Sequence, residues 1–180
     1  MIPRDERWLA AWLGDLARGD GRPGLIVSGS CFGVARVADG AGPLGAFGSD
    51  DFNAYPHSMR RILQAIRASG APRVVFVSGD LHLSALTEIE VTEAAGTARL
   101  WSVAASALNA TLPFSNTRAE ELSADWITLP CSDDHRQVRA RSDVLSTAYR
   151  QFSRVGLKRS GQEWLLSVTS VDETGSESAQ

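Results

Sequence analysis

The sequence is poor in the residues on which several functional classes depend. Its 180 residues include only two cysteines, Cys31 and Cys131, and three histidines. Two cysteines so far apart cannot build the disulfide framework that is typical of small secreted domains. A two-metal hydrolytic centre needs many nitrogen and oxygen ligands, and a single Asp-x-His motif cannot supply them all.

The sequence also lacks a basic excess and long apolar runs. The formal net charge is −3, and the basic residues are scattered or mixed with acids, as in 132–136. No stripe of positive charge follows from this pattern, so we expect no nucleic-acid binding. No apolar run approaches the roughly 20 residues that a membrane span requires. The first residues contain acids and lack the apolar core of a signal peptide, and the compartment stays open.

What is present is the composition of a globular protein. Hydrophobic residues make up 43% of the chain and charged residues 22%, which is enough for one domain with a proper core. We expect a single domain over residues 1–171, followed by a polar, frayed tail over 172–180.

Hydrophobic periodicity predicts an α/β fold. Helices and short buried strands alternate in the first part of the chain, at 5–18, 25–28, 56–69 and 74–77. Two antiparallel hairpins follow, 85–92 with 97–104 and 152–158 with 163–171. The first helix places Trp8 and Trp12 on its apolar stripe, and we expect both to pack in the core. Residues 123–141 are polar and weakly patterned.

The predicted strand 74–77 ends in a Ser-Gly break that is followed by Asp80 and His82. Polar groups just past a strand end lie where open α/β sheets bind their ligands. Side chains two residues apart in an extended chain point the same way, so this carboxylate and imidazole could bind one metal ion or a bridged pair. Leu81 and Leu83 would then point into the core. The alternative is an ordinary Gly-Asp turn beside a hydrogen-bonded core histidine.

A second candidate is the segment Gly29-Ser-Cys-Phe-Gly33, which fits the pattern of a nucleophile elbow with Cys31 as the nucleophile. Such an elbow runs from a strand through a sharp turn into a helix, and the residues after Gly33 predict no helix. We therefore interpret Cys31 as a small buried residue. A Cys31 ester hydrolase with His82 or His135 as base remains an alternative. His57 and His135 are otherwise expected at the surface.

Four segments, taken in order, resemble the PhoD-like alkaline phosphatases of the calcineurin-like metallophosphoesterase superfamily. The segment Val75-Phe-Val-Ser-Gly-Asp-Leu-His82 resembles their Gly-Asp-x-His signature, and Asp50-Asp-Phe-Asn-Ala-Tyr-Pro56, followed by a helix with arginines, resembles their Asp-x-Trp-x-x-Tyr-Pro segment. Trp8-Leu-Ala-Ala-Trp-Leu13 is similar to their Trp-Leu helix, and 106–116 is similar to a loop of some bacterial members. Together the segments span nearly the whole chain.

The resemblance implies a hydrolase of small phosphate esters with a dinuclear metal centre, in which a metal-activated hydroxide attacks phosphorus. His82 matches a metal ligand, and Asp80 matches either a ligand or a group that orients one. Asp50, Phe52 and Tyr55 would belong to the wall of the substrate pocket, although Phe52 replaces the usual tryptophan. Calcium, manganese, iron and zinc are all compatible with such a site. Monoesters and diesters are not distinguished.

The resemblance also implies that this chain corresponds to the C-terminal half of a β-sandwich flanked by helices. The family's earlier metal-ligand motifs are not found upstream of Trp8, so a missing N-terminal half is a possible partner. An exposed sheet edge and an exposed apolar helix face should follow. A non-catalytic binding module on the same scaffold is the other hypothesis, and it predicts that His82→Ala changes little except stability.

Overall fold

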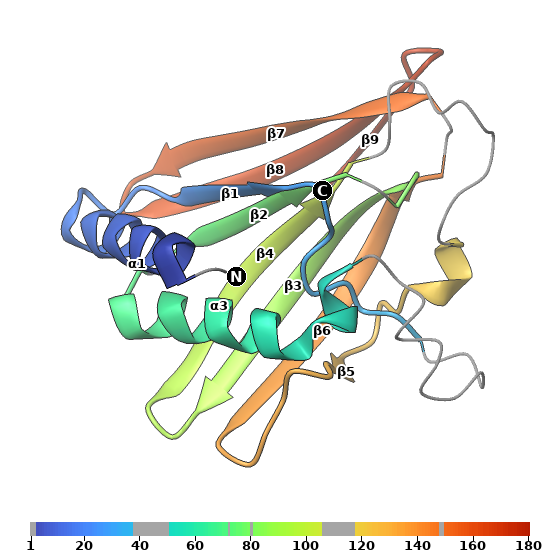
Figure 1. Ribbon diagram of the computed structural model, residues 1–180. Helices are drawn as coiled ribbons and strands as arrows, with labels where there is room; N and C mark the ends of the chain where they lie inside the picture. The colour runs from blue at the N-terminus through green and yellow to red at the C-terminus, as the bar shows by residue number, and fades with distance from the viewer. Residues whose placement is uncertain (1–2, 38–50, 72, 80, 106–117, 148–149) are drawn as a thin grey trace.

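The protein is built in three layers, with two helices on one face of a large sheet and a small sheet on the other (Figure 1). The computed structural model describes residues 3–37, 51–71, 73–79, 81–105, 118–147 and 150–180. The elements are α1 (Pro3–Arg18), β1 (Gly24–Ser28), η1 (Phe52–Ala54), α3 (Pro56–Ser69), β2 (Val74–Ser78), β3 (Ser84–Glu93), β4 (Gly96–Ala104), η2 (Ala119–Glu121), β5 (Ile127–Thr128), β6 (Arg136–Ser146), β7 (Gln151–Ser160), β8 (Glu163–Asp172) and β9 (Glu177–Ala179).

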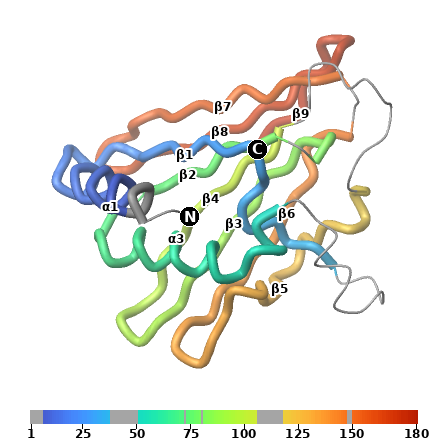
Figure 2. Tube along the Cα trace, in the orientation of Figure 1, coloured from blue at the N-terminus to red at the C-terminus, as the bar shows by residue number. Residues whose placement is uncertain are grey.

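The large sheet is mixed and has six strands in the order β1-β2-β4-β3-β6-β5. Strands β1, β2 and β4 are parallel, and the β3, β6 and β5 pairings are antiparallel. The small sheet is antiparallel, in the order β7-β8-β9. The three parallel strands run in one direction and lie side by side in the trace of Figure 2, so their carboxyl ends meet at one edge. The predicted α/β class and both predicted hairpins are confirmed.

The main core lies between the large sheet and the two helices. Met59, Leu63 and Ile66 on α3 pack against sheet residues that include Ile89 and Phe76. The spacing of the apolar residues on α3 matches the helical period, which is why this face is buried. The rings of Phe32 and Phe76 are stacked at 3.9 Å between centroids. Burial of this cluster keeps α3 of the βαβ unit β1-α3-β2 packed on the large sheet.

A second apolar cluster joins the two sheets. Val75, Leu86 and Val103 of the large sheet are buried with Val168 of β8, and Leu166 packs against them. These residues belong to strands whose other faces meet the helices, so the central strands are covered on both sides. The small sheet therefore packs on the large one through hydrocarbon.

Two sequence-based expectations are wrong, and one segment for which no element was predicted contains part of a strand. The weakly patterned segment 123–141 contains most of β6, in which Val138, Ala140 and Ser142 are buried alternately. The tail is not frayed throughout, since Glu177–Ala179 pair with β8 as β9. Trp8 is 68% exposed and is stacked on Trp12 at 6.4 Å between ring centroids instead of lying in the core.

The expected exposed edge is present. Strand β1 forms one edge of the large sheet, and its Val27 is 79% exposed. Leu25, two residues earlier on the same side of the strand, is also exposed. None of the helices in the described part of the chain is long and apolar enough to cross a membrane.

Candidate functional site

The carboxyl ends of the parallel strands bring three connecting segments to one edge of the large sheet. Ser28 of β1 lies beside Ser78 of β2, and Ser78 lies beside Ala104 of β4. The backbone N–H of Ala105 donates to the carbonyl oxygen of Ser78 at 2.8 Å, which extends this contact past the strand ends. In open α/β sheets this edge is where ligands bind, and the Asp-x-His motif follows β2 at this edge.

Cys31 ties the segment after β1 to the segment after β2. Its Sγ donates to the carbonyl oxygen of Gly79 at 2.7 Å, and the side chain is completely buried. The described residues after Gly33, up to 37, form no helix. The interpretation of Cys31 as a small buried residue is therefore confirmed, and a thiol in this position cannot meet a substrate without opening the site.

His82 has a left-handed backbone, with φ at 55°, which is uncommon for a residue other than glycine. It is half-buried, whereas Leu81 and Leu83 on either side are fully buried in the cluster that also contains Cys31. The prediction that both leucines point into the core is confirmed. A strained backbone persists only where the surroundings hold it, and such positions are frequent at functional sites. Asp80 lies outside the described residues, so its pairing with His82 stays a prediction.

The aspartate-rich segment lies against the loop that follows β1. The backbone N–H of Phe52 donates to the carbonyl oxygen of Cys31 at 2.9 Å. The ring of Phe52 packs against Phe32 and the main core. Tyr55 is 57% exposed at the start of α3, and Asp50 lies outside the described residues. The structure thus brings the two segments together, while the ring of Phe52 itself serves the core.

Asp51 caps η1. Its Oδ1 accepts from the backbone N–H of Asn53 at 2.8 Å, and its Oδ2 accepts from Nε of Arg36 at the same distance. The carboxylate is only 2% exposed, so the arginine compensates a buried charge. Asn53 Nδ2 donates to the carbonyl oxygen of Val34, and Asn53 Oδ1 has no partner among the described residues.

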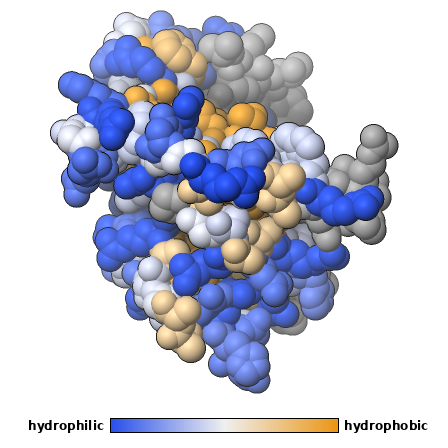
Figure 3. Space-filling view, turned by 90° about the vertical axis from the view of Figure 1, so that its left-hand side faces the viewer, coloured by the Kyte–Doolittle hydropathy of each residue, from blue (hydrophilic) through white to orange (hydrophobic). Residues whose placement is uncertain are grey.

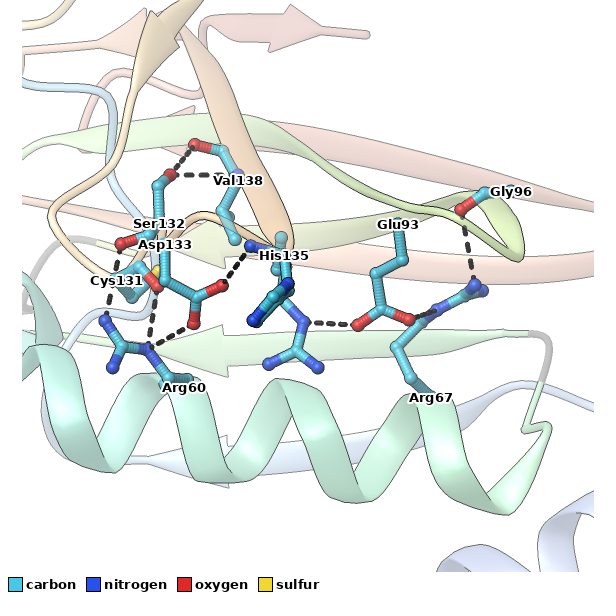
Figure 4. Close-up of polar contacts among 10 residues, drawn as sticks. Arg60, Arg67, Glu93, Gly96, Cys131, Ser132, Asp133, His135 and Val138 are labelled. Carbon is cyan, nitrogen blue, oxygen red and sulfur yellow. Dashed lines mark hydrogen bonds and ion pairs between the residues drawn. The ribbon is translucent and has the colours of Figure 1, made fainter.

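Arg60, the first arginine of α3 after the Tyr-Pro pair, makes structural contacts. Figure 4 shows Arg60 reaching the segment before β6, where Nε lies 3.2 Å from the carbonyl oxygen of Cys131 and 3.2 Å from Oδ2 of Asp133. Burial raises the pKa of the Cys131 thiol to about 11, so this thiol is neutral at physiological pH. A hydrogen bond from the backbone N–H of His135 lowers the pKa of Asp133.

The same view shows a second tether along α3. Arg67 lies 3.4 Å from Glu93 at the end of β3, and its Nη2 donates to the carbonyl oxygen of Gly96. Arg136 of β6 also pairs with Glu93. His57 and His135 are exposed, as expected from the sequence. The charged side chains of this cluster therefore fasten the helix to the strands.

Among the residues that the structure describes, no three His, Cys, Asp or Glu side chains gather in a way that could hold a metal ion. A complete metal centre would therefore have to draw on side chains outside those ranges, of which Asp80 is one. The sequence analysis also missed a cavity between the sheets, lined by residues that include Arg73, Arg99 and Trp101. No local pattern signals it, because it depends on which strands become neighbours.

No protein-family profile, curated protein or solved structure matches this chain.

Proposed function

We propose that the segment after β2 contributes to the centre of a metal-dependent phosphoesterase, with His82 and Asp80 as metal-binding side chains. The observation that supports this most is the left-handed backbone of His82 at the carboxyl edge of the parallel strands. The resemblance of the surrounding motif to Gly-Asp-x-His supplies the reaction class. Small phosphate esters are the proposed substrates.

The donor set suits such a centre in kind but not in number. An imidazole nitrogen and a carboxylate are ligands that zinc, manganese and iron accept, and calcium accepts the carboxylate. When bound, paired ions of this kind activate water and neutralise charge on phosphoryl oxygens. Two side chains cannot surround two ions, so the proposal requires further ligands from other segments. The buried neighbours Leu81 and Leu83 would fix the direction of His82.

Metal titration tests the proposal directly. Isothermal titration with Mn²⁺ or Zn²⁺ should show weak binding that is lost in His82→Asn and retained in His57→Asn. Asparagine tolerates a left-handed backbone better than most residues, so His82→Asn removes the imidazole with little added strain. His57 is exposed near the start of α3 and serves as the matched control.

Hydrolysis of p-nitrophenyl phosphate and its bis ester should be slow with the chain alone and should fall further in His82→Asn. Equal metal binding and equal rates in the two histidine variants would contradict the proposal and favour the non-catalytic binding module. Full activity lost on alkylation of a cysteine, and unaffected by metal chelation, would instead favour the Cys31 hydrolase.

A further inference from the structure

A cavity of about 530 Å³ lies between the large sheet and the β7-β8 hairpin. Its lining includes Arg73, Arg99 and Trp101 on the large sheet and Leu157, Trp164 and Leu166 on the small one. Pro23 and Arg73, which precede β1 and β2, place the cavity toward the amino ends of these strands, away from His82. From the α1 side, hydrophobic residues show at the surface between hydrophilic ones (Figure 3).

The small-sheet wall of the cavity is mostly apolar, and the large-sheet wall mixes apolar with charged side chains. Trp101 of β4 and Trp164 of β8 are half-buried, and Leu157 and Leu166 pack against the cluster that joins the sheets. A cavity of several hundred Å³ with apolar walls and a few polar groups is typical of small-molecule sites. An apolar or aromatic body of a ligand would therefore lie between the two sheets.

The charged side chains that line the cavity are three arginines, Arg73, Arg99 and Arg141, and two carboxylates, Glu88 and Asp143, so the arginines outnumber the carboxylates by one. Glu88 is 5% exposed, and one of its oxygens accepts from Nη2 of Arg141 at 2.7 Å and from Nε at 3.0 Å. Glu90 pairs closely with Arg139. Arg99 lies between the two glutamates at 3.6 and 3.7 Å, beyond hydrogen-bond distance, and is 65% exposed. The two close pairs leave Arg99 with the longer contacts only, and its N–H donors make no hydrogen bond among the described residues.

Arg73 is a second cation without a carboxylate partner among the described residues. Its guanidinium donates to the carbonyl oxygens of Gly21 at 2.8 Å and of Gln162 at 3.5 Å. Arg73 and Arg99 line the same cavity, and they precede by two residues the paired Val75 of β2 and Trp101 of β4.

We propose that this cavity binds an organic anion with an apolar body, whose carboxylate or phosphate lies between Arg73 and Arg99. Guanidinium groups recognise planar or tetrahedral oxyanions through paired N–H donors, and Arg99 has donors to offer. The apolar body lies against Trp101 and Trp164. The site is separate from the proposed phosphoesterase centre and does not depend on it.

The test uses 2-naphthoate as the probe and 2-naphthylmethanol as its neutral analogue. Indole N–H signals of the tryptophans, followed by NMR, report where each probe binds. Naphthoate should shift the signals of Trp101 and Trp164 and leave that of exposed Trp8 unchanged. It should bind about tenfold or more tightly than the alcohol, because a charge-assisted hydrogen bond is lost with the neutral probe.

Variants then assign the anion to the arginine pair. Arg99→Gln should weaken naphthoate binding about tenfold or more, and Arg99→Lys should weaken it less. The matched control is Arg154→Gln, which removes an exposed arginine that pairs with Glu177 on β9 and does not line the cavity. His82→Asn should leave naphthoate binding unchanged, which separates this site from the phosphoesterase centre.

Three results would overturn the proposal. Equal binding of naphthoate and the alcohol would mean that the cavity is a site for neutral apolar molecules. An equal loss in Arg154→Gln and Arg99→Gln would mean that only the overall charge matters. Absence of any shift at Trp101 and Trp164 at millimolar naphthoate would mean that the cavity takes no such ligand. Thermal melts of each variant confirm that it is folded.

Discussion

The two faces of the large sheet are made by the same strands and have opposite character. On the face under α1 and α3, β3 places Ile89 and Val91 in a fully buried core. On the other face, the same strand places Glu88 and Glu90 against arginines of β4 and β6. Because successive side chains alternate across a strand, one segment of sequence serves both environments.

The difference shows which face of the sheet contributes most to the stability of the fold. The helix-covered face is mainly apolar, its buried hydroxyls of Thr87 and Ser142 are hydrogen-bonded to each other, and it supplies most of the free energy of burial. The opposite face is apolar only where the small sheet covers it, as at Val103 and Val168, and is charged beyond that cover. Side chains on the charged part cost less to change, so that is where a ligand site can be placed.

The largest expected effect is on the helix-covered face. Ile89→Ala should lower the free energy of unfolding by about 2–5 kcal/mol, because it removes buried methyl groups and leaves a cavity. Ile89 also fills the space above Gly33, where an added Cβ would lie 2.4 Å from Ile89 Cδ1. Urea unfolding measures the change, with exposed Leu165→Ala on β8 as the control. A loss below about 1 kcal/mol would contradict the statement that the helix-covered face contributes most to stability.

The residue next to it on β3 should have a smaller effect. Glu88→Gln keeps the shape of the side chain and leaves Arg141 without its carboxylate. We expect a loss of about 1–3 kcal/mol, since a nearly buried charge pair is broken and one charge stays unpaired. Exposed Glu163→Gln is the control in the same urea experiment. If Glu88→Gln matched Ile89→Ala, the charged face would contribute as much as the core.

Local patterns explain what the sequence predicted well. Helices α1 and α3 and both hairpins follow from periodicity and turn residues, which act over a few positions. Strand β6 was missed because its outward positions carry arginines, such as Arg139, and its inward positions include small residues, such as Ser142. Ser142 is suited to the core only because its hydroxyl meets that of Thr87, 2.7 Å away on β3. A partner so far along the chain leaves no local trace.

The same limit applies to the sites. The sequence placed His82 after a strand end and put Leu81 and Leu83 in the core, because these depend on the strand itself. The left-handed backbone of His82 and the bond from Cys31 to Gly79 require the packed loops. That Arg73 and Arg99 line one cavity depends on the pairing of β2 with β4. Trp8 lies on its predicted stripe, but its exposure depends on how far the sheet extends beneath α1.

The next effect concerns pH at the end of β3, where Glu93 contacts Arg67 of α3. Burial favours the neutral form of Glu93, but the hydrogen bonds and charges of Arg136 and Arg67 outweigh burial and lower the pKa of Glu93 below its ordinary value of 4.5. Its stabilising contribution is therefore present above about pH 4.5 and is lost as the pH falls through its lowered pKa.

Urea unfolding of the protein and of Glu93→Gln across pH 3 to 7 tests this linkage. The difference between the two curves should shrink as the pH falls below 4.5. Asp133 and Asp172, whose pKa values are also lowered, change stability in both proteins and cancel in that difference. A difference that stays constant from pH 7 to pH 3 would show that the ionised form of Glu93 contributes nothing.

The smallest expected effect is at Arg99 on the charged face of the large sheet. It is the most stringent test of the contrast between the two faces. Arg99→Gln removes only the long contacts to Glu88 and Glu90. The side chain is largely in solvent, so the free energy of unfolding should change by no more than about 0.5 kcal/mol. Urea unfolding in low and high salt measures it. A loss above about 1 kcal/mol would make Arg99 a structural partner of the glutamates. A cation held for a ligand should instead matter to binding and hardly at all to folding.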